Sequence, residues 1–396
     1  MNAFFASVEQ RDFPELRGLP VAVTNGERGS CIITSSYEAR AKGVRTGMRL
    51  PEAKKLCPDI IQRPARPKVY AGISTRIMHV LQDVSPDIEV FSVDEAFLDV
   101  THCQRLHGTP VRMAHMVKEK IFNVSHLLCS AGVAGDKTTA KFAAKLQKPD
   151  GLTVIPPWEA RERLRNEPVT ALCGIAKGVG SFLAQYGACR CGEVGELPIG
   201  ILARRFGNLG RRIWLMCQGD DPDRVHTDVP APKSMGHGKV VPPDTHDIEV
   251  LLTYFRHMSE KLGARLRRHA MQAQHFYIGL KQQDGWLGMK LRLATPDNDA
   301  SAIFRLCRYV ITNHWNQRGV FQVQVTALDP QPSNQQLELF TPQREAEQQR
   351  NAVMDAINQR FGEFSLAPAR LLNRSDMPNV IAPAWKPDGH RQTIED

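Results

Sequence analysis

Two adjacent carboxylates, Asp94 and Glu95, are the side chains in this sequence with the clearest capacity for chemistry. Apolar residues at 90, 91 and 93 precede them and others at 97, 98 and 100 follow, which is typical of two strands buried on at least one face. Neighbouring side chains in a regular strand point to opposite faces, so both carboxylates reach one ligand only where the backbone bends at a hairpin or bulge. A divalent cation such as Mg²⁺ would relieve their mutual repulsion. A bare Asp-Glu pair is more often an ordinary acidic turn, so the context decides.

Four motifs in chain order supply that context. They are Asn2–Gln10 (NAFFASVEQ), Ser36–Arg40 (SYEAR) with a Gly-Val pair after it, Ser92–Ala96 (SVDEA) and Lys148–Gly151 (KPDG). Together they resemble the Y-family, or translesion, DNA polymerases, over roughly residues 1–340. The resemblance implies that Asp94 and Glu95 hold two catalytic Mg²⁺ ions in the palm domain of a polymerase.

The same resemblance implies an α+β, multidomain right-hand polymerase. We expect these parts: a ferredoxin-like palm at 1–11 and 68–151, fingers at 12–67, a helical thumb at 152–228, a linker at 229–233, a β-α-β-β-α-β little finger at 234–330, and a clamp-binding motif with a C-terminal tail at 331–396. The residue patterns agree with this division. They predict palm helices at 70–84 and 109–124, a palm strand at 127–133, and little-finger strands at 234–240, 273–281, 287–294 and 320–328.

The N-terminus departs from the family pattern. The family begins with a buried strand that ends in a metal-binding Asp, and this Asp would fall just before Met1. Asn2 is no substitute, because it occupies a different position and carries no charge. We expect that the start is cut short and that the omitted strand leaves a gap in the central sheet; the alternative is a protein that truly lacks this ligand and is catalytically impaired. The Met1 backbone carbonyl would be a metal ligand only if chain precedes it.

Several residues are predicted to bind the incoming nucleotide. The resemblance places Phe5 under the sugar, where the ring would exclude a 2′-hydroxyl, and Phe4 is either part of the same site or a core aromatic. Ser35 or Ser36 caps the helix that follows, and a hydroxyl, a guanidinium and helix-start N–H groups suit a triphosphate. The residues implied to contact the triphosphate are Thr34, Tyr37, Arg40 and Lys148. A capped surface helix with a solvated Arg is the alternative for this segment.

Further residues are predicted to bind DNA and a sliding clamp. Leu172–Gly180 resembles a helix-hairpin-helix, which offers backbone N–H groups to phosphates, although its usual second Gly is Ala176. The predicted DNA contacts are Gly174, Lys177, Gly178, Gly180, Arg211 and Arg212. The segment Gln336–Phe340 resembles the pentapeptide by which bacterial polymerases bind the sliding clamp. Its contact residues would be Gln336, Leu337, Leu339 and Phe340.

Composition agrees with a DNA partner without proving one. Lys plus Arg is 51 against 42 for Asp plus Glu, which gives a net charge of +9. The nine cysteines are scattered and lack zinc-site spacing, so we expect free thiols in a reducing compartment. No signal peptide and no apolar stretch of about 20 residues is present, so we expect no membrane span and a cytoplasmic, nucleoid-associated monomer.

The sequence therefore predicts a template-directed DNA polymerase that adds deoxynucleoside triphosphates to a primer-template with low fidelity, in translesion synthesis and damage tolerance. The rival interpretation is a catalytically impaired, clamp-tethered DNA-binding accessory protein. A nucleotide cyclase built on a similar palm would leave the thumb, the little finger and Gln336–Phe340 unexplained.

Overall fold

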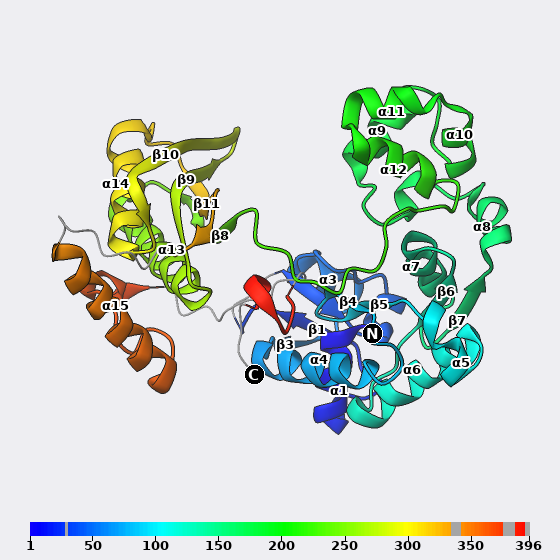
Figure 1. Ribbon diagram of the computed structural model, residues 1–396. Helices are drawn as coiled ribbons and strands as arrows, with labels where there is room; N and C mark the ends of the chain where they lie inside the picture. The colour runs from blue at the N-terminus through cyan, green and yellow to red at the C-terminus, as the bar shows by residue number, and fades with distance from the viewer. Residues whose placement is uncertain (28–30, 334–341, 375–384, 393–396) are drawn as a thin grey trace. The chain divides into compact units, whose positions relative to one another are not determined.

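The computed structural model describes residues 1–27, 31–333, 342–374 and 385–392. They form two compact units (Figure 1). Unit 1 is Met1–Val229 together with Met377–Asp396, and unit 2 is Pro230–Asp376. No helix in the described ranges combines the length and apolar character that a membrane crossing requires.

The first part of unit 1 is a three-stranded sheet covered by short helices. Its strands pair in the order β2-β1-β3, with β2 antiparallel and β3 parallel to β1. Ser36 caps α2 as predicted, because its hydroxyl accepts a hydrogen bond from the N–H of Ala39. The elements are α1 (Phe4–Asp12), β1 (Val21–Thr24), β2 (Ile32–Ser35), α2 (Tyr37–Ala41), α3 (Leu50–Leu56) and β3 (Ile61–Pro64).

Residues 67–155 carry the predicted Asp-Glu hairpin. The elements are α4 (Pro67–Leu81), β4 (Ile88–Ser92), β5 (Glu95–Leu98), α5 (Gln104–His107), α6 (Pro110–Ser125), β6 (Ala131–Ala134), α7 (Lys137–Leu146) and β7 (Leu152–Ile155). Antiparallel β4 and β5 form one two-stranded sheet, and parallel β6 and β7 form another. The strand predicted at 127–133 is shorter and later than expected, since residues 127–130 are not in a strand. Strand β7, which begins one residue after the expected end of the palm, pairs with β6.

A helical bundle follows, as the sequence predicts for the thumb. Its helices are α8 (Pro157–Leu164), α9 (Lys177–Ala184), α10 (Cys191–Glu196), α11 (Ile199–Phe206) and α12 (Asn208–Met216). They share a buried apolar core that includes Leu164, Leu183 and Leu202. Gly174 has a φ of 84°, which favours glycine, whereas Ala176 is extended with a φ of −91°. Alanine in place of the usual second glycine therefore causes no backbone strain in this hairpin.

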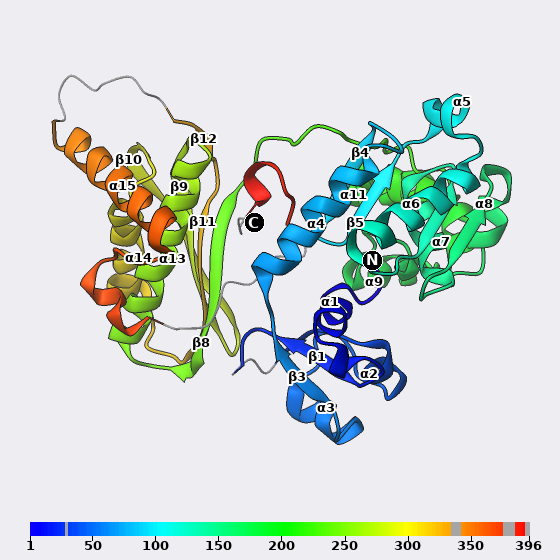
Figure 2. The same ribbon diagram turned by 90° about the horizontal axis from the view of Figure 1, so that it is seen from below.

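Unit 2 has the β-α-β-β-α-β order predicted for the little finger. Its sheet runs β10-β9-β11-β8, all antiparallel, and α13 and α14 pack on one face of it (Figure 2). Apolar residues on α13 and on the strands form one buried cluster. The elements are β8 (Met235–Thr245), α13 (Ile248–Arg268), β9 (Met271–Gln282), β10 (Gly285–Asp297), α14 (Ala300–His314), β11 (Val320–Ala327), β12 (Gln331–Pro332) and α15 (Pro342–Phe361).

Short 3-10 helices complete the described chain. They are Pro14–Leu16, Thr101–Cys103, Val169–Ala171, Ala369–Asn373 and Gly389–Arg391. The last belongs to unit 1, where Trp385 is fully buried in the same apolar cluster as Tyr70 and Ile77 of α4. The C-terminal tail thus contains a residue of the unit 1 core.

Candidate active site

The Asp-Glu pair lies at the turn between β4 and β5, where the sequence requires a bend. The register of the two strands shifts between Val90 and Ser92, and Ser92 then pairs with Glu95. The Ser92 hydroxyl lies 3.1 Å from Asp94 Oδ1 and 3.3 Å from Glu95 Oε2, so both carboxylates converge on one side chain. Val93 is buried and its carbonyl accepts a hydrogen bond of 2.6 Å from Ser74 on α4, which fixes the turn.

A lysine that the sequence analysis did not assign to the site pairs with Glu95. Lys141 Nζ lies 2.7 Å from Glu95 Oε2 and 4.0 Å from the centre of the Phe91 ring. Burial raises the pKa of Glu95, but the hydrogen bond and charge of Lys141, the charge of the chain's α-amino group and the Ser92 hydroxyl together bring that pKa below its usual value. The glutamate is therefore held ionised.

The amino end of the chain reaches the same turn. The Met1 α-amino group donates a hydrogen bond of 2.6 Å to the backbone carbonyl of Asp94. Met1, Asp94 and Glu95 line one cavity, and Lys148 lines it too. Two carboxylates on a rigid hairpin fit a hard divalent cation, but the described residues include no group of three or more acidic, His or Cys side chains placed to hold a metal ion. The donor set present is thus a partial one.

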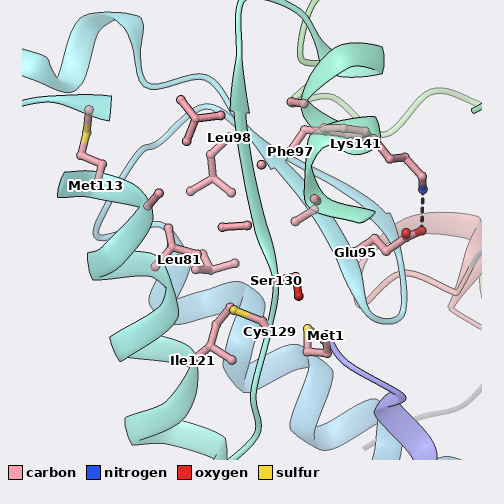
Figure 3. A pocket seen from close by; sticks show the side chains of 18 of the residues that line it. Met1, Leu81, Glu95, Phe97, Leu98, Met113, Ile121, Cys129, Ser130 and Lys141 are labelled. Carbon is pink, nitrogen blue, oxygen red and sulfur yellow. Dashed lines mark hydrogen bonds and ion pairs between the residues drawn. The ribbon is translucent and has the colours of Figure 1, made fainter. Parts of the chain in front are cut away.

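The cavity beside the pair is about 230 Å³ in volume and lies between two strands that lack a second neighbour. Within the described ranges β5 pairs only with β4, and β6 pairs only with β7. Both strands line the cavity, with α6 on another side (Figure 3). Most of the lining is apolar, including Phe97, Leu98, Met113, Ile121 and Val133. Within the described ranges the cavity is thus lined by two strands that each have one pairing neighbour.

The predicted sugar-contacting ring is held by an aromatic neighbour. Phe5 stacks on Tyr70, with ring centres 4.3 Å apart and an interplanar angle of 13°. The Tyr70 hydroxyl donates a 2.8 Å hydrogen bond to Glu9, and burial together with the charge of Glu9 raises the pKa of Tyr70. Phe4 and Phe5 are both buried, with exposed fractions of 3% and 8%. Both rings belong to the buried apolar cluster of unit 1, so their burial does not separate the two predicted roles of Phe4.

Asn2 connects three parts of unit 1 that are distant in sequence. Its amide nitrogen lies 3.3 Å from the Tyr37 hydroxyl and 3.0 Å from the Ser130 hydroxyl. Its amide oxygen accepts a 3.1 Å hydrogen bond from the N–H of Asp150, in the loop that contains Lys148. Asn2 was not expected to be a metal ligand, and its bridging role could not be predicted, because all three partners are far from Asn2 in the sequence.

The three predicted triphosphate contacts of the fingers lie together. Arg40 Nη2 is 3.5 Å from the Thr34 hydroxyl, and the Arg40 guanidinium lies 5.1 Å from the centre of the Tyr37 ring. Arg40 Nε also donates to the Ser35 carbonyl at 3.0 Å. Lys148 is exposed at the rim of the cavity, and its loop is held by an ion pair of 2.7 Å between Lys118 and Asp150.

The predicted DNA contacts of the thumb differ in their surroundings. Gly174, Lys177 and Gly178 are exposed at the start of α9, with Gly180 one turn on. Arg211 is exposed, whereas Arg212 pairs with Asp221 at 2.8 Å and Asp223 at 3.0 Å. Asp221 is buried and also accepts a hydrogen bond from Thr138, so Arg212 has a structural contact that the sequence did not reveal. The predicted clamp-binding residues Gln336, Leu337, Leu339 and Phe340 lie outside the described residues.

Known proteins are similar to this chain in both sequence and fold. Residues 1–145 match the impB/mucB/samB family and residues 232–339 match the C-terminal domain of that family. DNA polymerase IV of Moorella thermoacetica is 33% identical over 368 residues, which cover 91% of this chain and 92% of that protein. DNA polymerase IV of Shewanella woodyi is 38% identical over 68% of this chain and 74% of its own.

A solved structure agrees with the sequence matches. A Y-family DNA polymerase chimera superposes with a TM-score of 0.71 at 26% identity, and the alignment covers 83% of this chain and 96% of the chimera. The α+β polymerase fold predicted from the sequence is confirmed. With the carboxylate hairpin and the long curated alignments, this shows that the chain belongs to the impB/mucB/samB family of Y-family, translesion DNA-directed DNA polymerases.

Proposed function

We propose that the β4–β5 turn is the catalytic centre of low-fidelity, two-metal translesion synthesis. The observation that supports this most is the convergence of Asp94 and Glu95 at the rim of a cavity that Met1 and Lys148 also line. Primer extension with Mg²⁺ tests the proposal in a chain extended by an N-terminal apolar strand that ends in Asp. In that background, Asp94→Ala is expected to abolish extension while leaving DNA binding intact. Retained extension in that variant would reject the assignment.

The residues of this chain that would hold Mg²⁺ are the two carboxylates and, if chain precedes Met1, the Met1 backbone carbonyl. When bound, two such ions activate the primer 3′-hydroxyl and stabilise the pyrophosphate that leaves. Lys141 keeps Glu95 ionised, and Ser92 holds the two carboxylates on the same side of the turn. These contacts favour cation binding, because both carboxylates are already positioned and Glu95 is ionised.

A third carboxylate would complete this donor set. An apolar strand between β5 and β6 that ended in Asp next to Met1 would fill the 230 Å³ cavity and pair with both strand edges. It would also turn the Met1 α-ammonium into a peptide N–H, which removes a positive charge beside Asp94. The family pattern places the first metal-binding Asp at this position.

The incoming deoxynucleotide would lie between the fingers and the carboxylates. Phe5 would exclude a 2′-hydroxyl, and its ring is supported for this role by the parallel Tyr70 ring. Thr34, Tyr37 and Arg40 would contact the triphosphate from one side and Lys148 from the other. The contacts of Arg40 with both other residues support a shared phosphate site.

DNA would be held through its phosphates by both units. The start of α9 offers exposed backbone N–H groups together with Lys177. On unit 2, exposed residues alternate with partly buried ones along β10, and the exposed series includes Trp286, Lys290 and Arg292. Binding of this kind loses affinity steeply as salt rises.

We further propose that the protein binds a sliding clamp, is cytoplasmic and associated with the nucleoid, and is a monomer. They rest on the resemblance of Gln336–Phe340 to the clamp-binding pentapeptide and on the net charge of +9. The alternative, a catalytically impaired accessory protein, is favoured by the partial donor set at Asp94 and Glu95. DNA and clamp binding without metal-dependent extension would support it.

A further inference from the structure

The last segment of the chain, which follows unit 2 in the sequence, belongs to unit 1. Residues Met377–Asp396 belong to unit 1, while Pro230–Asp376 form unit 2. Unit 2 is therefore an insertion joined to unit 1 by two chain segments instead of one. The described part of this returning segment, residues 385–392, is here named the C-terminal strap.

Trp385 anchors the strap in the palm. Its side chain is fully buried and belongs to the same apolar cluster as Tyr70, Ile77 and Met78 of α4. Helix α4 has one apolar stripe of Ile73, Ile77 and Leu81. Ala71 and Met78, two turns apart, are buried outside that stripe, so α4 needs cover on a second side. Burial of a whole indole is a large apolar contribution for a single side chain.

The residues after Trp385 continue along the same surface. Lys386, Pro387 and Asp388 line a cavity of about 280 Å³ together with Met78 and His79 of α4. The cavity is also lined by Ile88 and Val90 of β4 and by residues 226–229, the last segment before unit 2. The strap thus lies beside α4, as both ribbon views show (Figures 1 and 2).

Gly389 fits the strap closely against the exit of the chain from unit 1. Its φ of 73° favours glycine, and a Cβ added there would lie 2.3 Å from Cγ1 of Val229. Val229 is the last residue before unit 2 begins. The segment entering unit 2 and the strap returning from it are therefore packed against each other on unit 1.

We propose that this surface of the palm, formed by α4, β4 and residues 226–229, is a binding site for the chain's own tryptophan-bearing C-terminal strap, and that the strap tethers unit 2 at its second end. The eleven Cα–Cα steps from Arg374 to Trp385 span at most roughly 40 Å when fully extended. Anchoring Trp385 therefore sets a second upper limit on the distance between the end of unit 2 and the palm, in addition to the limit set by the direct connection at Val229.

A cleavage experiment on the full chain tests the anchoring. A recognition sequence for a site-specific protease replaces residues 378–383, and the cut protein is run on a native sizing column. The C-terminal fragment is expected to co-elute with the remainder, and to separate when Trp385→Ala is added. Trp158→Ala is the matched control, because Trp158 is 82% exposed and its loss should leave the fragment bound. Separation of the fragment without any further substitution would overturn the proposal, as would a dimer held together by exchanged straps.

Tryptophan fluorescence gives a measurement that does not depend on a core truncation. Replacing Trp385 with Phe should remove an emission component that is blue-shifted and shielded from acrylamide, whereas Trp158→Phe should remove a red-shifted, readily quenched one. A solvent-exposed Trp385 component would overturn the anchoring.

Energy transfer between dyes at Glu159 in unit 1 and Tyr309 in unit 2 then tests the tether. In the Trp385→Ala variant, the cut fragment that carries the strap should separate from the protein. The distribution of transfer efficiencies should then be broader than in the uncut parent protein. An unchanged distribution would overturn the tethering role and leave only the binding site.

Discussion

Replacing Asn2 with Ala should weaken nucleotide binding as well as the fold. The Asn2 side chain is buried and contacts the Tyr37 hydroxyl, the Ser130 hydroxyl and the N–H of Asp150 at 3.3, 3.0 and 3.1 Å. Net hydrogen bonds of this kind contribute about 1 kcal/mol each, so the truncation should cost roughly 2–3 kcal/mol in total. Two of these contacts position Tyr37 and the loop of Lys148, both proposed triphosphate ligands.

Loss of that positioning should raise the Kd of an incoming deoxynucleoside triphosphate about tenfold, which corresponds to about 1.4 kcal/mol. The measurement is titration of the nucleotide into a complex of the protein with a dideoxy-terminated primer-template, so that no turnover is needed. Asn2→Asp should recover most of the affinity, because the Tyr37 and Ser130 hydroxyls can donate to a carboxylate.

Ser125→Ala is the matched control for Asn2→Ala. Ser125 is buried in unit 1 and its hydroxyl donates to the Ile121 carbonyl and accepts from the N–H of Leu127, away from the nucleotide residues. It should lower the melting temperature without changing the nucleotide Kd. If Asn2→Ala changed the Kd no more than Ser125→Ala does, Asn2 would be a purely structural residue and the bridging argument would be wrong.

Three further substitutions test other parts of the site. In the chain extended by an N-terminal strand that ends in Asp, Phe5→Ala should raise ribonucleotide use relative to deoxyribonucleotide use by roughly 10–100-fold, or about 1.4–3 kcal/mol, in competitive single-nucleotide addition. Unchanged discrimination would refute the sugar-excluding role. Lys141→Met should raise the pKa of Glu95, since burial then dominates. In the parent protein, the lowered pKa of Glu95 contributes stability at pH values above the unfolded-state pKa, and this contribution is lost as the pH falls through the folded-state pKa. Unfolding curves measured from pH 7 to pH 3 should show this loss in the parent. In Lys141→Met the free energy of unfolding should change less with pH. Replacing Leu339 and Phe340 together with Ala should abolish binding to a sliding clamp in a pull-down at constant DNA affinity, and retained binding would remove the clamp assignment.

Local signals were enough to predict the parts of the fold that short sequence patterns encode. The Ser36 cap and the bend at Asp94 and Glu95 each follow from residues within one element.

The contacts that the sequence could not reveal join residues far apart in the chain. Lys141 meets Glu95 only because α7 and the hairpin pack together, and Arg212 is engaged by a buried aspartate that its own helix does not predict. Trp385 is a single aromatic in a Pro-containing tail with no periodic pattern, so nothing local indicates that it is buried against α4. Each of these depends on tertiary packing.

Primer extension with three forms of the protein tests the central claim most directly. The first form is the chain of residues 1–396. The second is that chain extended by an N-terminal apolar strand that ends in Asp, and the third is the extended chain with Asp94→Ala. The account predicts Mg²⁺-dependent extension by the second form, little or none by the first, and none by the third. Robust activity in the first form would show that two carboxylates suffice. Absence of activity in all three, with DNA binding intact, would contradict the catalytic assignment and favour the accessory protein.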